Sequence, residues 1–117
     1  MSRKAGDRYE SAAREFLENQ GYDVIAANYR YGRKEIDLIC VDSDELVFVE
    51  VKGGRSQAFG DPVFRVDTRK QQAIIEVAQG YIAGATRSYS AYRFDVVLVR
   101  EDRGKLEIEH RKAAFTL

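Results

Sequence analysis

The amino-terminal part of the chain carries apolar residues at the spacing of a helix. Steps of three and four residues separate Tyr9, Ala12, Ala13, Phe16 and Leu17. This period places the five side chains on one face of a helix, and Gly21 follows as a stop signal. The pattern therefore predicts an amphipathic helix over residues 7–19.

Three segments rich in Val, Ile, Leu and aromatic residues follow, at 22–30, 35–41 and 45–52. Short polar turns separate them, which is typical of strands joined by hairpins. We expect the three segments to form an antiparallel meander. Beyond them, residues 53–66 contain three glycines and Pro62, and this composition predicts a loop.

The second half of the chain returns to helical spacing and then to strands. One apolar stripe runs along residues 68–83, and Asp67 or Thr68 can cap the start of this helix. Residues 93–100 have the composition of a buried strand, and residues 105–110 predict a final strand. A strand, a crossover helix and a further strand favour a right-handed parallel connection, so we expect the strand at 93–100 to lie parallel to the strand at 45–52.

The predicted order is α-β-β-β-α-β-β, a single α/β domain over residues 1–117 with a mixed sheet flanked by helices. The 117 residues, 44% of them hydrophobic, suit one compact core. Nineteen basic and nineteen acidic residues give no formal net charge, which excludes a strongly basic protein of the kind that binds nucleic acid through overall charge. A nucleic-acid site would have to be local.

Apolar runs in the chain are short, and the chemistry of its single cysteine is limited. The longest runs span four residues, far below the roughly 20 needed for a membrane helix. Polar residues follow the basic start of the chain where a secretory signal would need an apolar stretch. Cys40 lies in an apolar segment and reads as a buried structural thiol. We expect a cytoplasmic protein with no membrane contact.

Two acids can be placed opposite each other if a two-residue turn at Ser43 and Asp44 closes the hairpin. Paired positions then sum to 87, so Asp37 lies opposite Glu50. Opposed Cβ atoms are about 4.5 to 5.5 Å apart, where two carboxylates repel unless a cation or proton lies between them. Mg²⁺ prefers such oxygen ligands, and Lys52 shares the strand face of Glu50. A different register would leave an ordinary solvated acidic face.

Other polar residues border the same predicted face. Glu10 lies beside the apolar stripe of the first helix, and Lys70 and Gln71 begin the stripe of the second. Basic residues gather between positions 52 and 70 and include Arg65 and Arg69, with Phe59 as an aromatic neighbour. Such a loop suits phosphate contacts and base stacking, although charged loops are usually only solvated.

Three segments resemble the signature segments of the uncharacterised bacterial YraN family. They are residues 35–39 (Glu-Ile-Asp-Leu-Ile), 48–52 (Phe-Val-Glu-Val-Lys) and 93–97 (Arg-Phe-Asp-Val-Val). The family is similar in fold to restriction-endonuclease-like nucleases of the PD-(D/E)XK type and to archaeal Holliday junction resolvases. The resemblance implies Glu10 as the helix acid, Asp37 as the strand acid, and Glu50 with Lys52 as the E-x-K pair.

The resemblance has departures that bear on individual residues. Ile36 stands where the wider motif often has proline, and Lys34 stands where the family usually has glycine. After the lysine, the family typically has one small residue and then arginine. Here two glycines, Gly53 and Gly54, precede Arg55, so no role is transferred to Arg55. The family itself has no established substrate, and function must be argued from the site.

Two functional hypotheses remain open. In the first, the protein is an endonuclease that cleaves phosphodiesters in nucleic acid, with DNA expected and branched or junction DNA as a candidate. Asp37, Glu50 and Glu10 are then metal ligands for Mg²⁺, which Mn²⁺ can replace, and Lys52 completes the catalytic set. Nucleic acid would contact Lys70, Arg69, Arg65 and Gln71, and a homodimer would suit a junction with two strands to cut.

In the second hypothesis, the protein is a nucleic-acid-binding module that keeps the fold without turnover. The complete set of three acids and one lysine favours the enzyme, because close acids beside a phosphate path oppose binding unless a metal is present. For Asp95 and His110 we expect a structural hydrogen-bonding role instead.

Overall fold

The computed structural model describes residues 3–55 and 57–116, with side chains from residue 6 onward. Its elements are α1 (Arg3–Asn19), β1 (Asp23–Tyr31), β2 (Lys34–Asp42), β3 (Glu45–Arg55), the short 3₁₀ helix η1 (Pro62–Phe64), α2 (Thr68–Gly84), β4 (Ala91–Asp102) and β5 (Lys105–Phe115). The order is the one predicted from the sequence. Within the described part of the chain, neither helix is long and apolar enough to cross a membrane.

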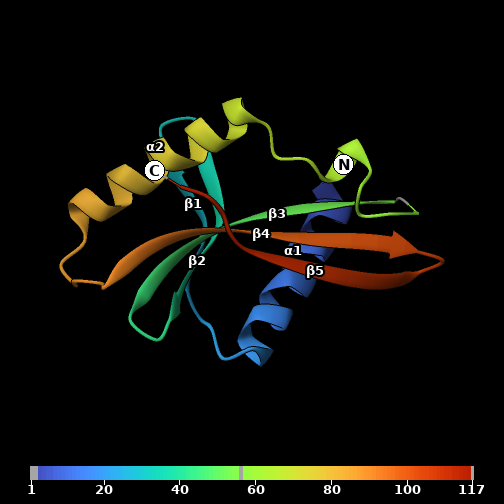
Figure 1. Ribbon diagram of the computed structural model, residues 1–117, viewed down its shortest axis with the longest axis horizontal. Coiled ribbons are helices and arrows are strands. Elements are labelled where there is room, and N and C mark those ends of the chain that lie inside the picture. The colour runs from blue at the N-terminus through green and yellow to red at the C-terminus, as the bar shows by residue number, and fades with distance from the viewer. Residues whose placement is uncertain (1–2, 56, 117) are drawn as a thin grey trace.

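The five strands form one mixed sheet in the order β1-β2-β3-β4-β5 (Figure 1). Strands β1, β2 and β3 form an antiparallel meander, and β4 pairs with β3 in parallel through the α2 crossover. Strand β5 returns antiparallel along β4. The expected meander and the expected parallel pair are therefore both confirmed.

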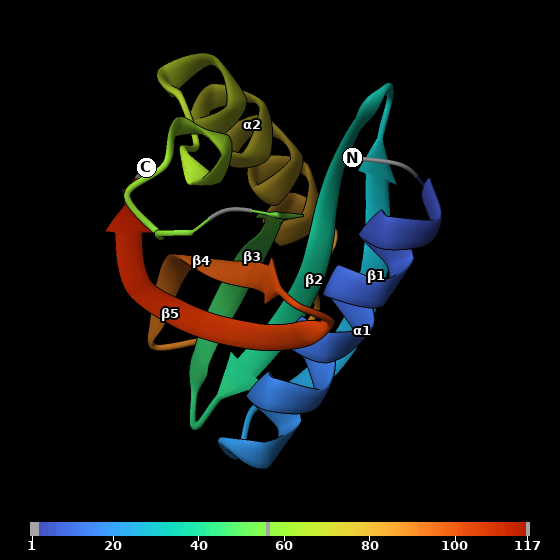
Figure 2. The same cartoon turned by 90° about the vertical axis from the view of Figure 1, so that its right-hand side faces the viewer.

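The two helices lie on opposite sides of the sheet (Figure 2). Tyr9, Ala13 and Leu17 of α1 pack on one face, and Ile74 and Val77 of α2 pack on the other. Because both faces are covered, the middle of β3 is buried on both sides, and from Leu46 to Val51 each of its residues is buried. This position decides the environment of any polar residue that β3 carries.

Local sequence signals account for most element ends, and the differences are extensions. The Asp67 carboxylate accepts a hydrogen bond from the Lys70 backbone N–H at 2.8 Å, so Asp67 is the helix cap. Strand β3 continues to Arg55, and η1 interrupts the segment that was expected to be a loop. Strand β5 continues to Phe115, five residues beyond the predicted end, because pairing with β4 resumes after a bulge between Phe94 and Val96.

The turn between β2 and β3 has the predicted register. Asp42 pairs with Glu45 and Leu38 with Val49, and both pairs sum to 87. Ser43 adopts a positive φ of 58°, which suits a tight two-residue hairpin turn. The turn thereby sets which side chains of β2 and β3 become neighbours further along the hairpin.

A buried carboxylate ties β4 to β5. Asp95 is fully buried and accepts hydrogen bonds from Arg93 Nε at 2.9 Å and from the Ala113 backbone N–H at 3.0 Å. His110 Nε2 lies 2.7 Å from the second carboxylate oxygen. These bonds agree with the structural role expected for Asp95 and His110, and they hold the pKa of Asp95 below its usual value despite its burial.

Gly53 allows α1 to approach β3 closely. A Cβ atom at this position would lie 2.1 Å from Cδ2 of Tyr9. The Tyr9 ring has little freedom to move, because it is buried and its hydroxyl donates a hydrogen bond to Glu101 at 2.6 Å. We therefore expect Gly53→Ala to lower the free energy of unfolding by about 1 to 3 kcal/mol, measured by urea denaturation.

Gly84→Ala is the matched control, because a Cβ atom there meets nothing within 4 Å. Gly84 ends α2, so alanine should leave stability unchanged or raise it by up to about 1 kcal/mol. Equal stability of the Gly53→Ala variant and the wild type would contradict the close approach.

Candidate carboxylate site

Asp37 lies where the backbone pairing between β2 and β3 stops. The last regular pair of the hairpin is Leu38 with Val49, one residue short of Asp37 and Glu50. At this point Asp37 Oδ2 accepts a hydrogen bond from the Val51 backbone N–H at 2.8 Å. A side-chain carboxylate therefore bonds to the β3 backbone immediately beyond the last regular pair, and Asp37 lies next to Glu50.

Glu50 is a buried acid in the middle of the sheet. Only 6% of its surface is exposed, and its Oε2 atom makes no hydrogen bond. Burial, followed by the negative charge of Asp37, raises the pKa of Glu50 from its ordinary value of 4.5 to about 8. Burial raises the pKa of Asp37 as well, although the hydrogen bond from the Val51 backbone N–H opposes this shift. The raised pKa of Glu50 favours one proton on the pair near neutral pH.

Two lysines flank the pair on the α2 side of the sheet. Glu50 shares this face with Leu46 and Phe48, as the alternation of β3 requires, and Lys52 follows on the same face. Lys70 in the first turn of α2 places its Nζ atom 3.8 Å from Glu50 Oε1. Both lysines favour the ionised form of Glu50, but burial outweighs them.

Glu10 approaches the pair from α1, on the other side of the sheet. It is half-buried and hydrogen-bonds Asn28, and burial followed by the charge of Asp37 raises its pKa. Among the described side chains, no three acidic, histidine or cysteine residues form a cluster that could hold a metal ion. The close pair is Asp37 with Glu50, and the metal role of Glu10 stays a prediction.

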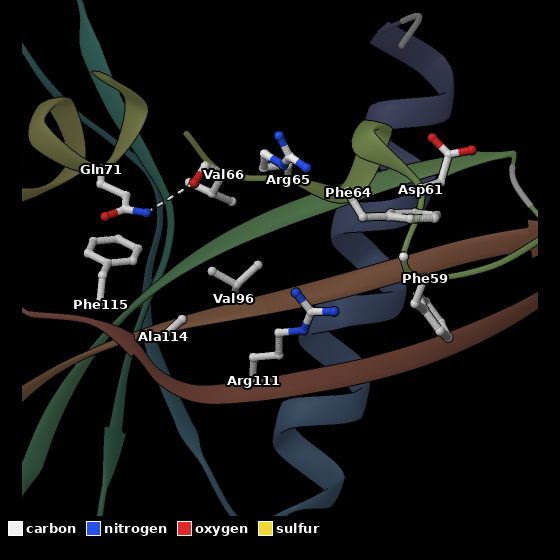
Figure 3. A pocket seen from close by; sticks show the side chains of 11 residues that line it. Phe59, Asp61, Phe64, Arg65, Val66, Gln71, Val96, Arg111, Ala114 and Phe115 are labelled. Atoms are coloured by element: carbon white, nitrogen blue, oxygen red, sulfur yellow. Dashed lines mark hydrogen bonds between the residues drawn. The ribbon is translucent and has the colours of Figure 1, made fainter. Parts of the chain in front are cut away.

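The residues predicted to contact nucleic acid divide into two that line a cavity, Arg65 and Gln71, and two on α2 that do not, Arg69 and Lys70. Arg65 and Gln71 line a cavity of about 380 Å³ (Figure 3), whose wall also includes Val96, the strand partner of Glu50. Gln71 Nε2 donates a hydrogen bond to the Val66 carbonyl at 3.0 Å. Lys70 faces Glu50, and Arg69 is exposed on α2. Their contact with nucleic acid stays a prediction.

Three residues near the site were given no functional role from the sequence. Asn28 has a positive φ of 53° and holds Glu10, while Arg111 and Phe115 of β5 line the cavity. Val96 of β4 pairs with Glu50 of β3 on one side and with Arg111 of β5 on the other, so Arg111 lies in the same row as Glu50 across the sheet. No sequence signal marked this relation, because it needs the parallel pairing of β3 with β4, which joins segments far apart in the sequence.

The carboxylate pair fits the requirements of a small divalent cation. Mg²⁺ takes one or two protein carboxylates and completes its shell with water and phosphate oxygens. Asp37 and Glu50 supply two carboxyl groups that already share one positive charge as a proton, and the Oε2 atom of Glu50 lacks a partner. A cation would neutralise the pair in place of the proton.

The raised pKa of Glu50 has a direct consequence for metal-free stability. The folded protein keeps a proton that the unfolded chain loses above about pH 4.5, so stability from this group is present at low pH and is lost as the pH rises to about 8. Glu50→Gln removes this titration. In EDTA, the variant should gain at least about 1 kcal/mol relative to wild type between about pH 5 and about pH 8, measured by urea denaturation.

Glu15→Gln provides the control, because Glu15 is exposed on α1. This variant should follow the pH dependence of the wild type. A Glu50→Gln variant that runs parallel to the wild type over the whole pH range would contradict the shared proton.

Comparison with known protein families identifies relatives of the whole chain. The model of the uncharacterised protein family UPF0102 matches residues 9–99. The UPF0102 protein of Chlorobaculum parvum is 42% identical over 116 residues, covering 94% of this chain and 90% of the relative. The UPF0102 protein of Symbiobacterium thermophilum is 44% identical over 99 residues, covering 85% of this chain and 84% of the relative.

A third relative, the UPF0102 protein of Alkaliphilus oremlandii, is 38% identical over 117 residues, covering 98% of this chain and 100% of the relative. The matched segment contains Asp37, Glu50 and Lys52. These matches confirm the YraN-like family that the sequence motifs predicted. The likeness to nucleases stays a prediction. The chain belongs to UPF0102, an uncharacterised protein family.

Proposed function

We propose that this protein is a metal-dependent endonuclease that hydrolyses phosphodiester bonds in nucleic acid. The observation that carries the proposal is the buried pair of Asp37 and Glu50, which shares a proton beside two lysines. Structural acids normally have fixed hydrogen-bond donors, as Asp95 has in Arg93 and His110. The Asp37–Glu50 pair has one backbone donor and one lysine 3.8 Å away, and the orphaned Oε2 atom of Glu50 suits an exchangeable cation.

Asp37 and Glu50 would hold the ion. When bound, a divalent metal supplies Lewis-acid polarisation of the phosphate and a lowered pKa for an attacking water. The ion also relieves the repulsion that otherwise keeps a proton on Glu50. Glu10 remains the candidate for an outer ligand, since its carboxylate is close enough to Asp37 for their charges to interact.

Lys52 is the residue that we assign to charge stabilisation. It follows Glu50 by two positions on one strand, so both side chains face the α2 side of the sheet. Its ammonium group can meet the negative charge that develops on the phosphate in the transition state. Lys70 can serve the same purpose once a metal replaces its contact with Glu50.

The substrate class follows from the surroundings of the pair. Arg65, Arg69 and Lys70 gather at the start of α2, on the same side of the sheet as Glu50. A local group of cations suits a polyanion although the chain as a whole has no net charge. We assign nucleic acid as the substrate and DNA as the expected form, and branched DNA belongs in the test because a resolvase cuts two strands from two sites.

Cleavage of defined substrates tests the assignment. Purified protein is incubated with branched, single-stranded and duplex DNA and RNA, with Mg²⁺ and with Mn²⁺. We expect metal-dependent cleavage of at least one substrate, abolished by Glu50→Gln. Lys52→Ala should lower the cleavage rate on the order of a hundredfold or more and weaken binding only modestly, because it removes a transition-state interaction.

Lys105→Ala is the matched control, because Lys105 is an exposed lysine at the start of β5. It should leave the cleavage rate unchanged. A wild-type protein that binds one substrate and cuts none with either metal would overturn the enzyme assignment. In that case, the slope of the logarithm of the binding constant against the logarithm of the salt concentration becomes decisive. A slope that Lys52→Ala reduces by about one unit would establish a binding module.

A further inference from the structure

The cavity that Arg65 and Gln71 line has the size of a small-ligand site. Its volume of about 380 Å³ lies within the range of about 300 to 1,000 Å³ that is usual for such pockets. The walls come from the η1 region, the start of α2 and the strands β4 and β5, as Figure 3 shows. We call it the aromatic pocket, and its principal side chains are Phe59, Phe64, Arg65, Gln71, Arg111 and Phe115.

Aromatic rings bound this pocket, and they are held in place from behind. Phe115 packs on Phe94 with ring centroids 5.0 Å apart and planes 20° from parallel. Phe59 packs against Phe64 at 5.4 Å. Phe115 and Phe59 lie toward opposite ends of the pocket in Figure 3. Immobilised aromatic rings of this kind are stacking platforms for nucleobases.

The polar groups of the pocket match the rest of a nucleotide. Arg65 and Arg111 supply cationic groups for phosphate, and the solvent-exposed ion pair of Arg111 with Glu109 at 3.0 Å is one that a phosphate can replace. Asp61 is engaged as the cap of η1, accepting a hydrogen bond from the Val63 backbone N–H at 3.0 Å. The hydrogen bond from Gln71 to Val66 orients the Gln71 amide and leaves its oxygen as an acceptor. An acceptor on a fixed amide suits the amino groups on the edge of a base.

The pocket and the carboxylate pair belong to one row of the sheet. Glu50 pairs with Val96, and Val96 pairs with Arg111. Adjacent strands are about 4.8 Å apart, so the backbones of Glu50 and Arg111 are on the order of 10 Å apart. A stacked strand advances about 3.4 Å per nucleotide, so this separation spans about three stacked nucleotides, or fewer when the strand is extended. A strand with its phosphate at the pair can therefore place a nearby nucleotide in the pocket.

We propose that the aromatic pocket binds one unpaired nucleotide of the substrate strand near the phosphate at Asp37 and Glu50. The inference rests on the proposed nuclease function, because it takes a nucleic-acid strand at the pair as given. A pocket of this volume admits one base and excludes a base pair. The favoured substrates are then single-stranded ends, flaps or junctions with unpaired bases, and continuous duplex is disfavoured.

Binding with Ca²⁺ in place of Mg²⁺ tests the pocket apart from cleavage, because Ca²⁺ neutralises the acid pair but accepts a looser ligand geometry than Mg²⁺. Fluorescence anisotropy compares a roughly ten-nucleotide single-stranded DNA with a blunt duplex of the same length. We expect wild type to prefer the single strand by about tenfold or more, the contribution of one stacked base. Arg111→Gln should remove most of this preference and leave duplex binding little changed. Arg87→Gln, in the exposed segment after α2, is the matched control and should change neither.

A fluorescent base analogue reports on stacking directly. Single-stranded DNA that carries 2-aminopurine should show quenched emission on binding to wild type, and Phe115→Leu should reduce the quenching. Because Phe115 also packs on Phe94, thermal melting must show that this variant is folded. If the variant does not fold, the Arg111→Gln comparison decides.

The outcomes separate the pocket from the nuclease assignment. Metal-dependent cleavage together with equal binding of single strand and duplex would overturn the pocket and leave the nuclease. A single-strand preference that Arg111→Gln removes, in a protein that never cleaves, would support the pocket and overturn the nuclease. If Arg111→Gln and Arg87→Gln lower the affinity for single strand and for duplex equally, binding depends only on general surface charge, and the pocket proposal is overturned.

Discussion

Strand β3 occupies the middle of the sheet, and both of its faces are covered. α1 packs on one face and α2 on the other, so every residue from Leu46 to Val51 is removed from water. An acid in such a strand cannot be solvated by a change of rotamer. Glu50 must therefore be neutralised inside the protein, and its pairing with Asp37, its shared proton and its contact with Lys70 all follow from this constraint.

The sheet contains a second buried acid, Asp95, whose pKa is shifted in the opposite direction. Asp95 is more deeply buried than Glu50, yet its pKa is lowered whereas that of Glu50 is raised. The difference lies in the partners, because Arg93 and His110 hydrogen-bond Asp95, whereas Glu50 meets another carboxyl group. Burial alone thus does not mark a functional acid. The informative feature is burial that nearby positive charge does not offset, because the pKa of Glu50 stays raised despite its contact with Lys70.

The same geometry connects the pair to its surroundings. The in-register pairing of β3 with β4 and of β4 with β5 extends the row of Glu50 to Arg111, and the cavity lies over this row. A charged centre, a cationic rim and aromatic walls thereby share one face of a small domain. The family to which the chain belongs has no assigned activity, so these contacts carry the functional argument.

The amino-acid sequence by itself determined the order of the elements, because that order depends on local periodicity. It offered Asp67 or Thr68 as the cap and a two-residue turn for the β2–β3 hairpin, and the structure selected Asp67 and confirmed the turn. The neighbours Asp37 and Glu50 follow from the register that this turn sets. Only the tertiary structure decided the burial of Glu50, which requires both helices, and the position of Arg111 in the row of Glu50, which requires the parallel pairing of β3 with β4. It also decided that Glu10 approaches from the face of the sheet opposite α2. A helical wheel gives the direction of a side chain about its helix axis, but not which face of the sheet the helix covers.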